Sequence, residues 1–366
     1  MTRLDKVRSW MGKRGYEAVV VRANSDLRWI LGVARVMDDE VAHTALITAD
    51  AAWLHTDSRY YGAFVERLGE ESPWTVDAEP TGHAAWLAKR LVDAQARVVA
   101  VEDTLTLGFF ESLKHELNVR SGAALMPRLH GDLSLLRLVK DEDEILEMKR
   151  AQAVTDAAFT YISDFIEVGM SELEIRAELE GYMLSHGGDA LSFDSIIASG
   201  PNGANPHARP SARRVREGDM IVMDYGAALN DYHSDMTRTV CVGKPSDLQH
   251  KVYDIVRKAH EECARVAHPG IGGKKLHMVA VKVIEEAGYG SYFNHGLGHG
   301  VGVEIHERPH VGIKSTDTIP VGAVFTIEPG IYLPGEFGVR LEDFGVMREG
   351  GYEPFTASTH DLVCVG

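Results

Sequence analysis

The chain has 366 residues, 45% hydrophobic and 25% charged, so its composition is that of a globular protein long enough for two domains. Its net charge of −16 argues against nucleic acid and anionic lipid as partners, because phosphate binding needs a basic face. We expect no membrane span and no signal segment, because no apolar run approaches ~18 residues and the start is polar. The three cysteines have no metal-ligand spacing, so we expect reduced thiols in a cytoplasmic protein.

The first part of the chain alternates between helical and strand patterns, which predicts an α/β layer with a mixed sheet. The helices are expected near residues 2–14, 84–94 and 107–117, and the strands near 18–21, 44–48, 52–55 and 98–101. Composition shifts near residue 140, since all five tryptophans come before it. With the charged run at 140–144 as a linker, we predict one domain over residues 1–136 and a second over 137–366.

The second part repeats one order of elements. Two helices come first, then strands, then two more helices and a second set of strands. Capping signals at residues 141, 171 and 246 open the first three helices, and the fourth is expected from about residue 274. Gly218 and Gly226 flank Asp224 at the spacing at which two further glycines flank Glu328. This weak repeat predicts a duplicated α+β half-domain that closes around a shared centre.

Each set of strands contains a hairpin with one acid on each arm, folded about residues 230–231 or 334–335. These acids are Asp224 and Asp235 in the first hairpin, and Glu328 and Glu342 in the second. Folding brings each pair opposite or one step off, where like charges repel by roughly 4 kcal/mol at about 4 Å and an effective dielectric near 20. Cations among the four acids would remove this cost.

Between the hairpins lies a glycine-rich segment, residues 294–309, that we expect to be a tight loop. It carries His295, His299 and His306, and three histidines near four paired acids favour a site over isolated structural roles. Residues 306–310 match the zincin string H-E-x-x-H, but that motif works only on a helix and Pro309 would break one.

A further histidine, His207, lies in the segment 199–210, whose glycine, proline and asparagine content predicts irregular structure. Taken alone, a loop histidine is more often solvated than functional. The acids and His299 together form a hard oxygen set with one imidazole, which suits Mn²⁺, Co²⁺ or Zn²⁺. Four carboxylates balance two divalent cations, and such pairs, ~3.5–4 Å apart, lower the pKa of a bridging water toward ~7.

The spacing of these residues resembles that of the pita-bread metallopeptidases, the group of methionine aminopeptidase, aminopeptidase P, prolidase and creatinase. Asp224 and Asp235 match its D-x-G…D-x-T-R-T pattern, His299 matches H-G-x-G, Glu328 matches T-x-E-P-G, and Glu342 matches V-R-x-E-D. The resemblance covers nearly the whole chain. It implies that Asp224 chelates one metal, that Asp235 and Glu342 bridge both, and that His299 and Glu328 hold the second, with Glu328 also accepting a proton from the attacking water.

The resemblance extends to other residues. His207 and His306 are implied to hydrogen-bond the scissile carbonyl, His295 to line the substrate pocket, and Arg340 to orient ligands or engage substrate. Where some dipeptidases of the group carry an arginine for the substrate's C-terminal carboxylate, this chain has His310, which leaves dipeptidase and aminopeptidase both open.

Residues 24–32 and 56–60 resemble the creatinase-like N-terminal domain, which points to the branch that cleaves before proline. We therefore expect an α/β creatinase-like domain followed by an α+β pita-bread catalytic domain. The expected activity is Xaa-Pro dipeptidase (prolidase) or Xaa-Pro aminopeptidase, acting on short proline-containing peptides through a metal-bridging hydroxide, with two Mn²⁺ ions and a homodimeric assembly. The alternatives are a catalytically silent binding protein with this fold and a hydrolase of a non-peptide C–N bond.

Overall fold

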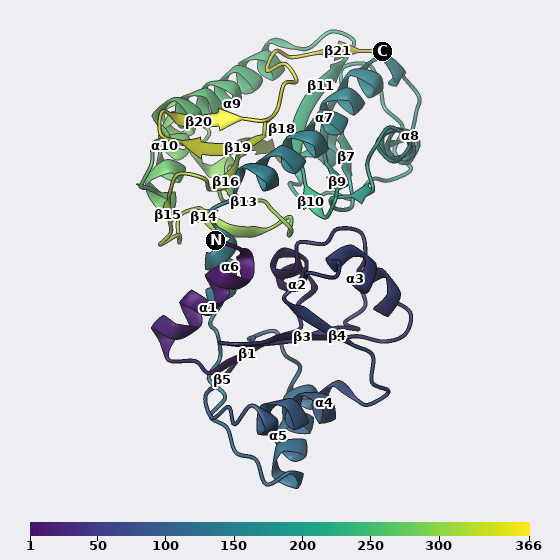
Figure 1. The fold of residues 1–366 in the computed structure, drawn as a ribbon. Coiled ribbons are helices and arrows are strands. Elements are labelled where there is room, and N and C mark those ends of the chain that lie inside the picture. The colour runs from purple at the N-terminus through teal and green to yellow at the C-terminus, as the bar shows by residue number, and fades with distance from the viewer. The chain divides into compact units, whose positions relative to one another are not determined.

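The computed structural model describes residues 1–366 apart from the side chain of Asp132, and these residues divide into two compact units, Met1–Arg137 and Leu138–Gly366. The secondary structure of both units is drawn in Figure 1. Among the described residues, no helix has both the length and the apolar character of a membrane span.

The first unit is built on a mixed β-sheet. Its strands are β1 (Ala18–Val21), β2 (Thr44–Thr48), β3 (Ala52–His55), β4 (Trp74–Asp77) and β5 (Val99–Val101). Their order is β4-β3-β2-β1-β5, with β1 antiparallel to β2 and parallel to β5. The sheet is therefore mixed, as the alternating pattern predicts. Every residue of β1 is buried, which is typical of a strand covered on both faces.

Helices cover both faces of this sheet. They are α1 (Arg3–Arg14), α2 (Asn24–Leu31), α3 (Tyr61–Leu68), α4 (His83–Asp93), α5 (Leu107–Val119) and α6 (Asp132–Arg137). In Figure 1, α4 and α5 lie on one side of the sheet, and α2 and α3 lie on the other. Val20, Trp86 and Leu113 join β1, α4 and α5 in one buried cluster. The sequence patterns did not predict α2, α3 and α6, which span only eight, eight and six residues, or the four-residue strand β4.

The second unit contains the two predicted rounds of helices followed by strands. Its long helices are α7 (Glu142–Phe165), α8 (Glu172–Ser185), α9 (Asp247–Val266) and α10 (Gly273–Glu286). Asp141, Ser171 and Ser246 cap the first three through capping boxes, in which cap and third residue satisfy each other's backbone N–H groups. The short 3₁₀ helices are η1 (Gly200–Ala204) and η2 (Gly290–Tyr292). Segment 199–210 is therefore more regular at its start than its composition predicts.

The strands of the second unit form several small sheets. They are β6 (Ala190–Leu191), β7 (Ile196–Ser199), β8 (Met220–Tyr225), β9 (Ala227–Leu229), β10 (Tyr232–His233), β11 (Met236–Val242), β12 (Ile271–Gly272), β13 (Gly298–Gly300), β14 (Glu307–Val311), β15 (Thr318–Ile319), β16 (Val324–Ile327), β17 (Gly330–Leu333), β18 (Phe337–Arg340), β19 (Asp343–Arg348), β20 (Gly351–Pro354) and β21 (Cys364–Val365). The main sheets run β21-β11-β8-β7 and β14-β13-β16-β19-β20, and an isolated bridge between Thr237 and Glu342 links them.

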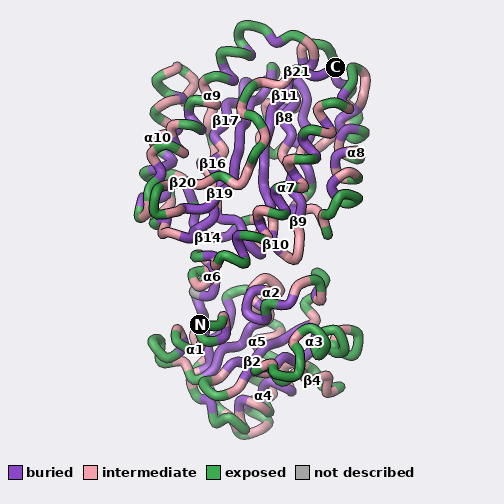
Figure 2. The backbone as a smooth tube through the Cα atoms, turned by 45° about the horizontal axis from the view of Figure 1, so that its top comes forward, coloured by how far each residue is buried: buried purple, intermediate pink, exposed green. Residues whose placement is uncertain are grey.

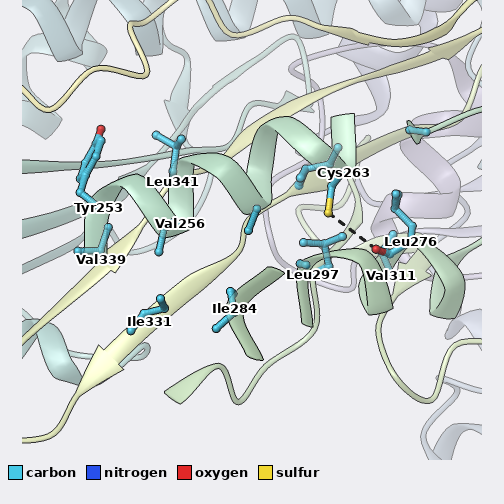
Figure 3. Packing of buried hydrophobic residues seen from close by; sticks show 14 of the residues in the cluster. Tyr253, Val256, Cys263, Leu276, Ile284, Leu297, Val311, Ile331, Val339 and Leu341 are labelled. Carbon is cyan, nitrogen blue, oxygen red and sulfur yellow. Dashed lines mark hydrogen bonds between the residues drawn. The ribbon is translucent and has the colours of Figure 1, made fainter. Parts of the chain in front are cut away.

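Each helix pair covers its own half of the strands. Residues of α7 and α8 share a buried cluster with β7, β8 and β11. A second cluster joins α9 and α10 to β17 and β18, and Figure 3 shows Tyr253 and Val256 of α9 with Ile331 and Val339 of these strands. The central strands are buried along most of their length (Figure 2). This double core gives the acid-bearing strand ends a rigid support.

The hairpins have the predicted turns but differ in register. In the first, Asn230 and Asp231 turn the chain with φ of 50° and 67°, and Thr237 is the partner of Asp224. Asp235 therefore lies two residues away from the position facing Asp224, on the diagonal. In the second, the pairs on both sides of the acids share one register, which sets Glu328 opposite Glu342.

Candidate metal centre and substrate pocket

The predicted site residues come together in one cavity of about 340 Å³ in the second unit. Its lining includes all nine of them, namely His207, Asp224, Asp235, His295, His299, His306, Glu328, Arg340 and Glu342. Apolar side chains from Phe193, Ile196 and Ile305 complete part of the wall. The cavity thus combines a dense acidic floor with apolar surface, which is the usual make-up of a small-ligand site.

The metal-ligand candidates converge from both hairpins. One ligand atom each from Asp235, His299 and Glu342 lies within 4.8 Å of the others. The Nε2 atom of His299 lies 3.5 Å from Oδ2 of Asp235 and 3.6 Å from Oε1 of Glu328. These separations match donor atoms that share a cation, because ligands at ~2.0–2.2 Å from a metal stand about 3–4 Å apart.

His299 is held in the tautomer that a metal requires. Its Nδ1 lies 3.1 Å from the carbonyl oxygen of Gly300, which can only accept, so Nδ1 carries the proton and Nε2 faces the acids with a lone pair. Desolvation and the nearby His306 lower the pKa of His299 to about 3, which keeps the ring neutral. His299 lies on β13, so this part of the segment expected to be a loop is a strand. Gly298 has to be glycine, because a Cβ atom there would lie 2.1 Å from the carbonyl oxygen of Thr326.

The acids repel one another in the absence of a cation. Burial and the charge of Glu342 raise the pKa values of Asp235 and Glu328 well above their usual range. Burial and the charge of Asp224 raise the pKa of Glu342 to about 8. Oδ1 of Asp224 is buried and has no hydrogen-bond partner among the described residues. An oxygen-rich set with one neutral imidazole and an unpaired buried carboxylate oxygen fits hard or borderline divalent cations.

Arg340 is bound to the site's own residues. Its Nη2 donates to Oδ2 of Asp224, its Nε donates to the hydroxyl of Thr237 at 3.0 Å, and its Nη1 donates to Tyr332 at 2.9 Å. The side chain is 3% exposed. These contacts support the first of the two roles implied for Arg340, the orientation of a metal ligand, because Arg340 binds Asp224 directly.

Tyr332 is a residue of the site that the sequence patterns did not predict. Its hydroxyl accepts from Arg340, so it donates to Nε2 of His295 at 2.9 Å, while Nδ1 of His295 donates to the carbonyl of Gly296 at 2.7 Å. Burial lowers the pKa of His295 to about 3. Both nitrogens of this ring are thus committed, so His295 offers the cavity a fixed neutral ring. The position of Tyr332 four residues after Glu328, on the same hairpin arm, was the available signal.

Thr237 was named only as part of a motif. Its hydroxyl donates to Oε2 of Glu342 at 2.7 Å and accepts from Arg340. One buried hydroxyl thus connects a candidate bridging ligand with the arginine that holds Asp224. Such outer hydrogen bonds fix the orientation of metal ligands.

The remaining histidines differ in placement. His207 and His306 are exposed side chains that line the cavity, and the ring centroid of His306 lies 4.3 Å from that of His299. His310 is exposed and does not belong to the lining of the cavity as described. The H-E-x-x-H string runs into β14 rather than a helix, as Pro309 predicts.

Two family models match this chain. The model of metallopeptidase family M24 matches residues 147–349, and that of the creatinase/prolidase N-terminal domain matches residues 3–139. The chain belongs to metallopeptidase family M24, so it is an enzyme of the pita-bread type with a creatinase-like first domain, as the sequence motifs predict. Divalent metal ions are the cofactors of this family.

Similar proteins cover the full length of the chain. An Xaa-Pro dipeptidase of Pyrococcus horikoshii is 34% identical over 361 residues, covering 99% of this chain and 98% of the relative. The solved structure of an Xaa-Pro dipeptidase from Bacillus anthracis has a TM-score of 0.92 at 32% identity, covering 99% of both chains. An X-Pro aminopeptidase from Thermotoga maritima has a TM-score of 0.87 at 34% identity, covering 96% of this chain and 98% of that one.

Proposed function

We propose that this chain hydrolyses the bond between an N-terminal residue and proline, using two divalent cations, Mn²⁺ foremost. The observation that carries the proposal is the convergence of four carboxylates and one neutral imidazole in a cavity, where Oδ1 of Asp224 is buried and has no hydrogen-bond partner in the part of the chain that the structure describes. The names of the similar proteins, dipeptidases and an aminopeptidase that act on Xaa-Pro bonds, support the same reaction.

Asp224, Asp235, His299, Glu328 and Glu342 would hold the cations. When bound, two such cations supply a water of pKa near ~7 as nucleophile and polarise the scissile carbonyl. Glu328 would accept the proton of the attacking water; the hydroxyl of Thr326 donates only a long hydrogen bond of 3.4 Å to Oε1 of this carboxylate.

Two cavity-lining histidines bind the reacting carbonyl. His207 and His306 line the cavity, and an imidazole has at least one N–H group that can donate to the carbonyl oxygen. Such a hydrogen bond strengthens as negative charge develops on that oxygen. His295 has no N–H group left for this purpose, because Gly296 and Tyr332 occupy both ring nitrogens. Its ring, with neighbouring apolar side chains, instead forms a wall that suits the proline ring.

The intact ligand set argues against the alternative of a silent binding protein, because retained buried acids without cations would only destabilise the fold. Residues 137–366 would carry the metal ligands and the peptide hydrolysis, and residues 1–136 contribute none of the proposed ligands. We also propose a homodimer in the cytoplasm. Light scattering tests the homodimer, and localisation of the tagged protein tests the cytoplasmic location.

The deciding experiment compares the parent with Asp235→Asn and Glu328→Gln on Xaa-Pro peptides and on matched Xaa-Ala peptides. The parent loaded with Mn²⁺ should release the N-terminal residue only from the proline series. Glu328→Gln should lose at least 10²-fold in kcat/KM, the size of a missing general base, and Asp235→Asn should lose activity because it removes a metal ligand. Equal hydrolysis of both series, or full activity of the variants, would refute the proposal.

A further inference from the structure

A second group of metal-ligating side chains lies outside the cavity. His260 of α9, Asp343 of β19 and His360 of the C-terminal segment each offer one ligand atom, and these atoms lie within 4.8 Å of one another. Nε2 of His360 donates a hydrogen bond to Oδ2 of Asp343 at 2.7 Å, and Nε2 of His260 lies 3.4 Å from the same oxygen. A cation bound here would replace the proton on Nε2 of His360. We call these residues the His–Asp–His cluster.

His260 is the unusual member of this cluster. The side chain is 1% exposed, and neither ring nitrogen has a hydrogen-bond partner among the described residues. Every neutral imidazole carries one N–H donor and one lone-pair acceptor, and leaving both unpaired in a protein interior costs free energy. Burial lowers the pKa of His260 to about 4, so a neutral ring is what the interior holds near pH 7. A ligand that takes up the ring's lone pair would explain this placement.

We propose that the His–Asp–His cluster is a third metal site, separate from the catalytic pair, that takes a single borderline cation such as Zn²⁺. Two imidazoles and one carboxylate are a known donor set for Zn²⁺, which leaves a further position for water. The set contains more nitrogen than the catalytic cluster, so it favours Zn²⁺ over Mn²⁺. His360 is one-third exposed, which gives an ion a route from solvent.

Arg238 is the main charge opposing this cation. Its Nη2 binds Oδ1 of Asp343 at 2.7 Å, so the carboxylate already has one positive partner. That contact occupies Oδ1, whereas both histidines face Oδ2. The guanidinium also donates to the backbone carbonyls of Glu342, Ser358 and Thr359, whose dipoles offset part of its charge. The remaining repulsion between Arg238 and the cation would lower the affinity of the cluster for the cation without preventing binding.

The cluster is well placed to act on structure. It joins α9, β19 and the C-terminal segment, and Asp343 directly follows Glu342, a candidate catalytic ligand. A cation there would fasten the C-terminal segment to α9 behind the catalytic strands. The expected role is therefore stabilisation of the strand end that carries Glu342, with no contact to substrate.

Counting Zn²⁺ by equilibrium dialysis tests the proposal in the full-length chain. Asp235→Asn with Glu328→Gln removes two ligands of the catalytic pair, and this background should still bind one equivalent. Adding His360→Gln to this background should abolish the binding of the one Zn²⁺ equivalent. His250 is an exposed histidine of α9, the helix that carries His260, and adding His250→Gln should leave Zn²⁺ binding unchanged. Zn²⁺ should also raise the Tm of the background and of its His250→Gln derivative but not of the His360→Gln derivative.

Two results would overturn the proposal: a background that binds no Zn²⁺, or binding that survives His360→Gln. His360→Gln is chosen over a change at His260 because the latter is buried and its loss could disturb folding, which circular dichroism checks in each variant. The outcome is independent of peptidase activity. If the protein binds one Zn²⁺ equivalent at this cluster but does not hydrolyse Xaa-Pro bonds, the proposed function is refuted and the third metal site is supported.

Discussion

Thr237→Val removes one hydroxyl at the centre of the candidate metal site while keeping the shape of the side chain. The hydroxyl donates to Oε2 of Glu342 at 2.7 Å and accepts from Nε of Arg340 at 3.0 Å. Thr237 is 0% exposed, so water cannot replace either hydrogen bond without a local rearrangement. The variant therefore leaves a carboxylate oxygen and a guanidinium N–H group unpaired in the interior.

The size of the effect follows from these contacts. A hydrogen bond to a charged group contributes about 1.5–3 kcal/mol, and each 1.4 kcal/mol corresponds to a factor of ten. The bond to Glu342 stabilises its ionised form, which is the form that binds metal. Its loss raises the pKa of Glu342 further, so at neutral pH a cation has to displace a more tightly held proton. We expect Mn²⁺ affinity to fall roughly 10–100-fold, within the range for outer-sphere ligand partners.

Isothermal titration of metal-free protein with Mn²⁺ measures this loss directly, and the same titration at pH 8.5 should show a smaller difference from the parent. Thr237→Ser keeps the hydroxyl and should bind Mn²⁺ like the parent. Thr239→Val is the matched control, because Thr239 is also buried but bonds only the backbone of Arg340. It should lower Tm without changing metal affinity. If Thr237→Val binds Mn²⁺ as tightly as the parent at both pH values, the hydroxyl does not position Glu342 and the reasoning is wrong.

Three further outcomes are expected. Burial raises the pKa of Glu342 from 4.5 to about 8, so between these values the folded metal-free protein holds a proton that the unfolded chain does not, and its stability falls as pH rises. Without metal, Tm should fall from about pH 4.5 to 8 and level off above pH 8; with saturating Mn²⁺ it should stay level. A level metal-free curve would contradict this. Lys140→Met should cost about 3–5 kcal/mol in urea unfolding, because it removes the ammonium group from a pair with Glu307 in which both side chains are 1% exposed, and adding Glu307→Leu should recover most of the loss. Among the described cavity-lining residues, Arg340 is the only arginine or lysine, and it already binds Asp224, so none of these residues offers a free cationic side chain to the C-terminal carboxylate of a dipeptide. Xaa-Pro-amide should therefore have a higher kcat/KM than Xaa-Pro with a free carboxylate. The reverse order would show that another cationic group binds the substrate's carboxylate.

The sequence determined those features that depend on neighbours along the chain. Capping boxes at Asp141, Ser171 and Ser246 set the starts of three helices, because a cap and its third residue satisfy each other locally. The turns at residues 230–231 and 334–335 fixed both hairpins, and with them the approach of each pair of acids. Family motifs then added the candidate ligands, which all line one cavity.

Tertiary structure decided what depends on partners far apart in the chain. Arg340 could have reached substrate, and only packing shows it bound to Asp224, more than a hundred residues away. The hydroxyl of Tyr332 fixes His295, and His260 meets Asp343 and His360, through contacts that no local pattern encodes. The physical reason is that caps and turns are stabilised within a few residues, whereas these contacts need residues far apart in the chain to be brought together by the packing of α9 and the strands.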